Sequence, residues 1–584
     1  MNGRSGFFKF FLFLFLGVII LLQALSMLQA DRLYERLNTL VSRLENSQAA
    51  KPVRTEGKLA ASKSSALEEY PGDDGDWLVW GIEGEPETLN PLTSRDVYAT
   101  WITGTYYFSN IFEGLLNYDF DTLKLKPQLA ESYEVSKDAL EITMRLRNDV
   151  HFSDGHPITA DDVIFSYKTI INPGVDAAQM RNYYNNLKEV VKIDDRTVKF
   201  IFDKPYFKSL EIAGDIPILP EHLYKFTDAN QFNNRRTDPV GSGPYVFEKW
   251  DVGREIVLIR NENYWGPKPR IKKIVFRVIT NEVAELQALR SHEIDFMRPR
   301  AEQYADVSVD KQFIKEFECL SFWIPQEGYA FIGWNEDTPF FRESKVRLAM
   351  TLLVDRDEIN KHLLKGLGRI ITGPFYILGP QHDPNIKPWP YDPNRAAQLL
   401  DEAGWIDHDG DGIRDKDGVP FRFKLMIVSG SPFYEQMGRL LKDALAQVGV
   451  DLVPDPYEWS VFSERLNNRS LDAVILRWGG VVLEDPYQIW HSSQIGNRGS
   501  NFVGFRNTRA DALIEEARTT IDEDKRNELY YRFDRILHEE QPYTFLFTRP
   551  ALELLDNRFE NVVVHKLGLN PHEWYVPKDK QRYK

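Results

Sequence analysis

The chain has 584 residues, and its 72 basic and 87 acidic side chains give a formal net charge of -15. Hydrophobic residues make up 42% and charged residues 27%, a balance that excludes a disordered chain and a membrane protein with many spans. Because a net negative charge repels phosphate backbones, we exclude nucleic acid as a partner. The length predicts at least two packed units.

Residues 1–30 carry a targeting signal. Arg4 and Lys9 precede an apolar run from Phe10 to Leu28, which is long enough to cross a bilayer core of about 30 Å. Positive residues before the run predict a cytoplasmic N-terminus and a body on the extracytoplasmic or periplasmic side. The run acts either as a cleaved signal peptide or as an uncleaved signal anchor. Its length favours a transmembrane helix that anchors the chain to the inner membrane.

Residues 31–75 separate this signal from the body. Their leucines at 33, 37, 40 and 44 follow a four-three-four spacing, which predicts a short helix. Such a helix either pairs with another helix, lies along the membrane or frays, because two heptads are marginally stable. Residues 46–75 are rich in Ala, Ser, Lys, Glu and Gly and predict a flexible linker.

The body alternates short β-type runs with helical periodicity, which predicts an α/β fold. The predicted strands are 77–81, 142–146, 197–202, 256–260, 273–279, 421–428 and 472–477. The predicted helices are 161–171, 355–365, 393–403, 434–448, 508–520 and 524–539.

Residues 146–163, LRNDVHFSDGHPITADDV, combine a strand, a turn and a helix start. Asp154-Gly155 forms the predicted turn, and Thr159 with Asp162 forms a capping box. Turn and cap chemistry accounts for these residue types, so we interpret the stretch as structural.

Several motifs occur in a recognisable order along the chain. They are EPETLNP at 85–91, IFEGLL at 111–116, the stretch at 146–163, GSGPYVF at 241–247, RNENYWG at 260–266, VRLAM at 346–350 and RWGGVVLEDP at 477–486. In this order they resemble the family 5 extracellular solute-binding proteins, which include dipeptide-, oligopeptide- and nickel-binding components of ABC importers.

The resemblance implies a two-lobed clamp like that of periplasmic binding proteins of type II, with an extra subdomain in the first lobe. It places the first lobe at 76–325, the extra subdomain at about 120–200 and the second lobe at 326–549. Residues 550–584 then return to the first lobe, so that the chain crosses the hinge near 326 and 550.

The resemblance also indicates where a ligand binds. In peptide-binding members, an Asp shortly after a Trp of the second lobe pairs with the peptide's α-ammonium group. Spacing from Trp478 puts Val481 at that position, so the amine partner is missing or has moved to Glu484 or Asp485. An unpaired ammonium group in a dry cleft costs several kcal/mol, so a neutral ligand such as an oligosaccharide is the alternative. Gly480 completes this predicted ligand-binding segment.

In the first lobe, the resemblance points to Thr100, Trp101, Ile102 and Thr103. They correspond to the segment that hydrogen-bonds the ligand backbone in peptide-binding relatives. We expect helix-terminal amides and hydroxyl groups there to receive a polar ligand.

The loop DHDGDGIRDKDG at 407–418 partly matches a calcium loop. Asp407, Asp409, Asp411 and Asp415 occupy the first, third, fifth and ninth positions. The twelfth position is Gly418, where a bidentate Glu belongs, so a polar turn is favoured over a calcium site. No cofactor is predicted.

The resemblance implies the substrate-binding protein of an ABC importer, which captures a peptide or similar solute and delivers it to an inner-membrane permease. The alternatives are an oligosaccharide-binding member of the same family and a membrane-tethered ligand sensor without transport. An enzyme is not predicted, because no Ser-His-Asp or paired-carboxylate motif stands out.

Overall fold

The computed structural model describes residues 70–583 except 95, 105–107 and 497–498. The predicted anchor at 1–30 and the predicted short helix after it lie outside the described residues. Within the described part, no helix is long and apolar enough to cross a membrane.

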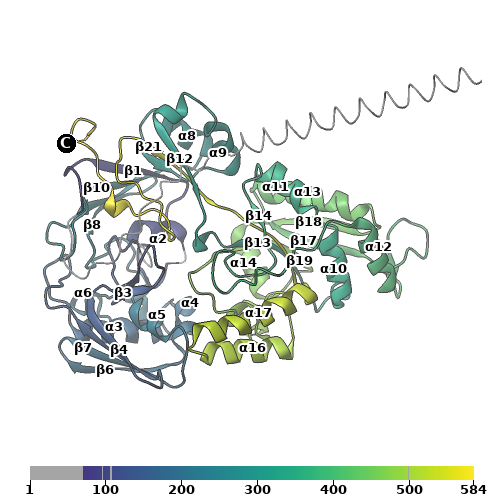
Figure 1. The fold of residues 1–584 in the computed structure, drawn as a ribbon, viewed down its shortest axis with the longest axis horizontal. Coiled ribbons are helices and arrows are strands. Elements are labelled where there is room, and N and C mark those ends of the chain that lie inside the picture. The colour runs from purple at the N-terminus through teal and green to yellow at the C-terminus, as the bar shows by residue number, and fades with distance from the viewer. Residues whose placement is uncertain (1–69, 95, 105–107, 497–498, 584) are drawn as a thin grey trace, which may run out of the picture. The chain divides into compact units, whose positions relative to one another are not determined.

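The first lobe is built on a seven-stranded sheet with the order β12-β21-β11-β1-β10-β9-β8 (Figure 1). Strand β1 pairs in parallel with β10 and β11, whereas β21 runs antiparallel to β11 and β12. The strands are β1 (Trp77–Ile82), β8 (Tyr245–Asp251), β9 (Glu255–Arg260), β10 (Lys273–Val278), β11 (Phe296–Met297), β12 (Phe317–Phe322) and β21 (Ala551–Asp556).

Both faces of this sheet are covered, as side-chain alternation along β1 shows. Leu78, Trp80 and Ile82 join the large core of the first lobe, whereas Val79 faces a smaller core with α8 and α9. The helices of this lobe are α2 (Val97–Thr103), α3 (Ala160–Ile171), α4 (Ala178–Arg181), α5 (Ser209–Gly214), α6 (Glu221–Tyr224), α7 (Ala229–Asn233), α8 (Glu282–Arg290) and α9 (Ala301–Val307).

A second, four-stranded antiparallel sheet extends the first lobe, in the order β4-β5-β7-β6. Its strands are β4 (Ala130–Val135), β5 (Glu141–Leu146), β6 (Leu187–Asp194) and β7 (Thr197–Phe202), and a small ribbon of β2 (Leu116–Tyr118) and β3 (Leu125–Pro127) precedes them. Helix α3 packs on this sheet, with Val163 and Ile170 in the same core as Met144. The capping box of Thr159 and Asp162 is present at its start.

The second lobe holds a six-stranded sheet in the order β14-β20-β13-β19-β17-β18. These strands are β13 (Tyr329–Trp334), β14 (Arg369–Ile370), β17 (Arg422–Val428), β18 (Asp451–Tyr457), β19 (Ala473–Trp478) and β20 (Tyr543–Thr548). A separate two-stranded ribbon pairs β15 (Asp415–Lys416) with β16 (Val419–Pro420).

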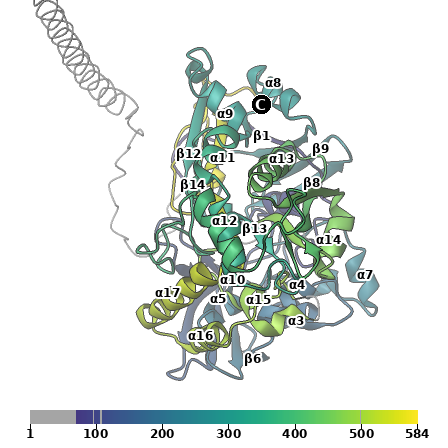
Figure 2. The same cartoon turned by 90° about the vertical axis from the view of Figure 1, so that its right-hand side faces the viewer.

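Helices cover both faces of the six-stranded sheet (Figure 2). Ile332 and Ile475 face α10 (Ser344–Leu352), α12 (Pro393–Glu402) and α13 (Pro432–Ala446). Phe331 and Val474 point to the opposite face, which α14 (Trp459–Asn467), α16 (Thr508–Thr519) and α17 (Glu523–Glu540) cover. The remaining helices are α11 (Arg356–Leu363) and α15 (Tyr487–Trp490), with short 3₁₀ turns η1 (Asn182–Tyr184), η2 (Phe313–Lys315), η3 (Pro325–Glu327), η4 (Ser492–Ile495) and η5 (Pro571–Glu573).

The chain passes between the two sheets twice. It leaves the seven-stranded sheet after Phe322 and enters the six-stranded sheet at Tyr329. It returns between Thr548 and Ala551, as the yellow C-terminal segment in Figure 1 shows. The structure is therefore a two-lobed α/β fold with both crossings close together. The predicted domain limits at 325/326 and 549/550 lie within these crossings and stay a proposal.

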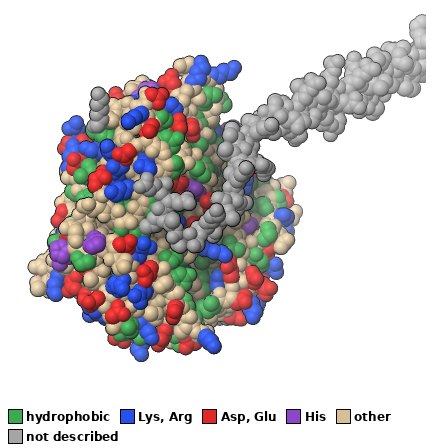
Figure 3. Space-filling view, turned by 60° about the vertical axis from the view of Figure 1, so that its left-hand side comes forward, with side chains coloured by type: hydrophobic (Ala, Val, Ile, Leu, Met, Phe, Trp, Pro, Cys, Tyr) green, Lys and Arg blue, Asp and Glu red, His purple; other side chains and the backbone are tan. Residues whose placement is uncertain are grey.

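On the face that Figure 3 shows, charged side chains are spread rather than gathered by sign. Figure 3 shows acidic and basic side chains interspersed on the visible face. The net charge of -15 is thus not concentrated there in one acidic patch.

Candidate functional site

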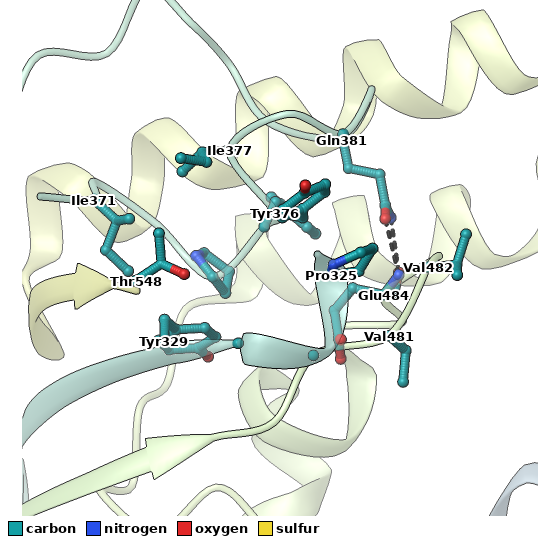
Figure 4. A pocket seen from close by; sticks show the side chains of 15 residues that line it. Pro325, Tyr329, Ile371, Tyr376, Ile377, Gln381, Val481, Val482, Glu484 and Thr548 are labelled. Atoms are coloured by element: carbon teal, nitrogen blue, oxygen red, sulfur yellow. Dashed lines mark hydrogen bonds between the residues drawn. The ribbon is translucent and has the colours of Figure 1, made fainter. Parts of the chain in front are cut away.

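A pocket lies where four segments of the chain meet in the second lobe. The segments are the first crossing around Pro325, the loop 371–381, residues 480–484 that follow β19, and Thr548 at the end of β20 (Figure 4). The pocket encloses about 460 Å³ of empty space, part of it open to solvent.

Gln381 fixes the backbone of Glu484 at one wall of this pocket. Its side-chain amide donates to the Glu484 carbonyl oxygen and accepts from the Glu484 backbone N–H, both at 2.8 Å. Figure 4 shows Gln381 reaching to this backbone from one side, while the Glu484 carboxyl group lies on the other. The two hydrogen bonds hold the predicted ligand-binding segment in one conformation.

Glycines allow the first crossing to approach this segment closely. Gly328 has a positive φ of 53°, and a Cβ there would collide with the carbonyl oxygen of Trp478. A Cβ at Gly480 would likewise collide with the carbonyl oxygen of Pro325. Gly480 is therefore required for backbone contact at the pocket wall.

Trp478 and Val481 occupy different surroundings. The Trp478 ring stacks between Phe331 and Phe502, with ring centroids 6.2 Å and 5.6 Å apart. It is not among the residues that line the pocket. Val481 does line the pocket and is 39% exposed.

Asp485 is engaged between the lobes. Its carboxylate accepts the Tyr206 hydroxyl at 2.6 Å, the Arg518 Nε–H at 2.9 Å and the Tyr487 backbone N–H at 3.1 Å. Tyr206 belongs to the core of the first lobe, and Asp485 is 7% exposed. In this arrangement the Asp485 oxygens serve the contact between the lobes and not the pocket.

Glu484 is the acidic residue that lines the pocket. Among the described residues, no hydrogen bond or ion pair reaches its carboxyl group. Burial raises the pKa of Glu484 from 4.5 to about 7, and Lys208 opposes this shift. The Lys208 ammonium group itself donates to the Leu483 carbonyl oxygen at 3.0 Å and pairs with Glu211 at 3.0 Å. A carboxyl group in this setting can receive a cationic ligand group.

The four predicted residues of the first lobe lie in α2, outside this pocket. Ile102 and Thr103 are buried, and the hydroxyls of Thr100 and Thr103 donate to carbonyl oxygens of their own helix. The Trp101 ring lies under the Arg298 guanidinium group, 4.7 Å from its centroid. The assignment of these residues to a ligand stays a prediction.

The acidic loop at 407–418 uses its carboxylates as turn acceptors. Asp407 accepts the N–H groups of Gly410 and Gly412, and Asp411 accepts that of Ile413. Asp409 accepts the Asp411 N–H, and Asp415 in β15 accepts from His408. These bonds supply what a polar turn needs. The weaker calcium alternative is not tested by these contacts.

Three comparisons relate this chain and its fold to known proteins. The sequence model described as "Bacterial extracellular solute-binding proteins, family 5 Middle" matches residues 124–500. The oligopeptide-binding protein AppA of Bacillus subtilis is 31% identical over 535 residues, which cover 89% of this chain and 94% of AppA.

Solved structures agree with the sequence comparison. The structure of Bacillus subtilis AppA in complex with a nonapeptide has a TM-score of 0.76 at 30% identity and covers 87% of this chain and 100% of AppA. NikZ from Campylobacter jejuni in complex with Ni(L-His) has a TM-score of 0.73 at 25% identity, with 85% and 99% of the chains covered.

Proposed function

This chain belongs to the bacterial extracellular solute-binding proteins of family 5, and from that premise we propose that it captures a peptide or similar small solute for an ABC importer. The body lies on the extracytoplasmic side in this proposal, and the permease stands in the inner membrane. The chain itself makes or breaks no covalent bond.

The position of Glu484 is the observation that carries the peptide proposal. Glu484 lines the pocket, and no hydrogen bond or ion pair from the described residues reaches its carboxyl group, whereas the Asp485 oxygens are occupied by Tyr206 and Arg518. A peptide's α-ammonium group supplies the missing partner, and a charge-assisted hydrogen bond in a half-buried pocket is stronger than a neutral one. The names of the relatives, an oligopeptide-binding protein and its nonapeptide complex, support the same ligand class.

Closure of the two lobes provides the signal for delivery. The Tyr206 hydroxyl of the first lobe donates to the Asp485 carboxylate of the second. The Phe207 backbone N–H donates to the Arg518 carbonyl oxygen, and the Lys208 ammonium group donates to the Leu483 carbonyl oxygen. A ligand that touches both sides favours this closed arrangement, which a permease then recognises.

The apolar run at 10–28 places the chain at the membrane in this proposal. It acts as an uncleaved anchor, and a cleaved signal peptide is the alternative. Membrane fractionation of cells, followed by N-terminal sequencing of the chain, distinguishes the two. A chain that begins after residue 30 in the soluble fraction would refute the anchor.

The test of the ligand class is calorimetric titration of the full chain with peptides and with the same peptides N-acetylated. We expect Glu484→Gln to weaken binding of free-amine peptides about tenfold or more, because the substitution removes the acceptor charge. Acetylated peptides bind weakly to both forms. Glu464→Gln, an exposed change on α14, is the matched control.

Two outcomes would refute the peptide proposal. Equal affinity of the wild type for free and acetylated peptides would show that Glu484 does not bind the peptide's α-ammonium group. Binding of oligosaccharides in place of peptides assigns the pocket, with its exposed Val481, to neutral ligands. Transport assays in cells without the permease separate an importer component from a membrane-tethered sensor.

A further inference from the structure

Two histidines and an aspartate meet on the surface of the first lobe, away from the pocket. Asp154 and His156 belong to the turn before α3, and His222 lies in α6. One ligand atom from each of the three side chains lies within 4.8 Å of the other two. None of these residues lines the pocket described above.

The backbone holds the turn that carries Asp154 and His156. The N–H of Phe152 donates to the His156 carbonyl oxygen at 2.9 Å, and the N–H of Gly155 donates back to the Phe152 carbonyl oxygen at 2.9 Å. Gly155 has a positive φ of 91°, which a non-glycine residue adopts at a cost. The Ser153 N–H donates to the Gly241 carbonyl oxygen, so the turn is also fixed to the rest of the lobe.

Helix α6 brings His222 to the same place. The backbone N–H of Glu221 donates to the Asp162 carboxylate at 3.0 Å, which ties α6 to the start of α3. Two donors thus come from one tight turn and the third from a neighbouring, hydrogen-bonded helix. Because these hydrogen bonds already hold the backbone in place, binding of a ligand here costs little backbone conformational entropy.

The spacing of the donor atoms suits one metal ion. The distance from Asp154 Oδ2 to His222 Nε2 is 2.7 Å, and that from Asp154 Oδ1 to His156 Nδ1 is 3.5 Å. Bonds of about 2.1 Å in tetrahedral geometry place ligand atoms about 3.4 Å apart. The two distances lie on either side of that value, and side-chain rotations are needed to bring all three donor atoms to one ion.

The histidine rings leave room for such rotations. Their centroids lie 3.8 Å apart at an interplanar angle of 27°, and the side chains of His156 and His222 are 60% and 30% exposed. Within the described part of the chain, these two histidines are the only ion-pair partners of Asp154. No Lys or Arg there competes with a cation for the carboxylate.

We propose that Asp154, His156 and His222 form a surface site for a divalent cation of the Zn²⁺ type. Two imidazole nitrogens with one carboxylate oxygen are donors that Zn²⁺ and Cu²⁺ prefer, whereas Ca²⁺ and Mg²⁺ prefer oxygen alone. The ion takes the place of the hydrogen bond between His222 and Asp154. Its remaining coordination positions face solvent, so water or a group from another molecule completes the shell.

The site is tested by calorimetric titration of the full chain with Zn²⁺ alone, in a buffer that does not chelate metals. We expect one ion per chain at this site, and a loss of affinity of about tenfold or more in His156→Gln. That substitution removes a largely exposed side chain, so the fold is retained. His151→Gln, on the same loop outside the cluster, and Asp409→Asn, in the exposed acidic loop, should leave the binding unchanged.

Electron paramagnetic resonance with Cu²⁺ as the probe reports the donors directly. The wild type should show coupling to two nitrogen nuclei, and His156→Gln and His222→Gln each to one. The proposal is overturned if Zn²⁺ does not bind saturably, or if His156→Gln binds it as tightly as the wild type does. Neither result bears on the peptide pocket.

Discussion

Two of the contacts that join the lobes are built differently. On the hinge side, Glu327 of the first crossing accepts hydrogen bonds from Arg477 at 2.6 Å and from Arg549 of the second crossing at 3.0 Å. On the far side, Asp485 accepts from Tyr206 and Arg518. The first contact ties together two covalent connections, whereas the second joins segments that are distant along the chain.

This difference separates the stability of the fold from the closure of the lobes. The Glu327 network joins the crossings and therefore need not break when the far ends of the lobes separate. In the proposed closure, the hydrogen bond from Tyr206 to Asp485 forms each time the lobes meet, and a bond to a charged acceptor contributes about 1.5 kcal/mol to the closed state. Substitutions at the two places should affect different measurements.

The largest effect is expected for Glu327→Gln, which leaves Arg477 and Arg549 without their anion. Breaking a buried pair costs about 3–5 kcal/mol, but the side chain of Arg549 is 47% exposed, so solvent screens part of this. We expect the free energy of unfolding to fall by about 2 kcal/mol in urea denaturation. Glu343→Gln, which breaks the half-exposed pair with Lys416, should cost under about 1 kcal/mol. Equal losses in the two variants would contradict the network.

The same network predicts how stability depends on pH. Burial raises the pKa of Glu327, but Arg549, Arg477 and Arg298 lower it more, and it falls from 4.5 to about 2. A carboxyl group whose pKa is lowered by folding stabilises the fold fully above its unfolded value of 4.5. This stabilisation is lost as the pH falls from 4.5 towards 2. The wild type should therefore lose more stability than Glu327→Gln over this range, and parallel pH profiles would contradict the assignment.

At the far contact, Tyr206→Phe removes one hydroxyl group and keeps the ring. A hydrogen bond to a charged acceptor contributes about 1.5 kcal/mol, so we expect ligand affinity to fall about tenfold with little change in stability. Small-angle X-ray scattering of the ligand-free chain should show a more open average. Tyr457→Phe is the control, because that hydroxyl donates to the Asp455 carboxylate at 2.7 Å within the second lobe, and neither residue lines the pocket. An unchanged affinity in Tyr206→Phe would mean that this bond plays no part in closure.

Local elements could be predicted from the sequence because local patterns produce them. The predicted strand 197–202 is β7, and the predicted helix 161–171 is α3 extended by one residue. Strands β20 and β21 are not predicted, because every residue in both is buried and the alternation that identifies a half-exposed strand is missing.

The site shows the same limit. The motif around Trp478 locates the segment that lines the pocket, and both Val481 and Glu484 lie there. Local sequence patterns cannot predict which residues this segment contacts. Gln381 and Glu484 are 103 residues apart, and Tyr206 and Asp485 are 279 apart. Only the tertiary fold shows that Asp485 is occupied while Glu484 remains open to the pocket.

The smallest effect is expected for Arg518→Lys, which asks whether charge alone is enough at the far contact. The Arg518 guanidinium group donates to Asp485 and lies 4.9 Å and 4.2 Å from the ring centroids of Tyr206 and Tyr487. Lysine keeps the charge but loses the planar group that stacks on these rings, a difference of about 0.5–1 kcal/mol. Ligand affinity should fall about two- to fivefold in calorimetric titration. Arg506→Lys, at an exposed pair with Asp337, should change nothing. If Arg518→Lys binds ligand as tightly as the wild type does, charge alone is enough to hold Asp485. If it loses as much affinity as Tyr206→Phe does, the stacking of Arg518 on the two rings contributes as much to closure as the Tyr206 hydrogen bond.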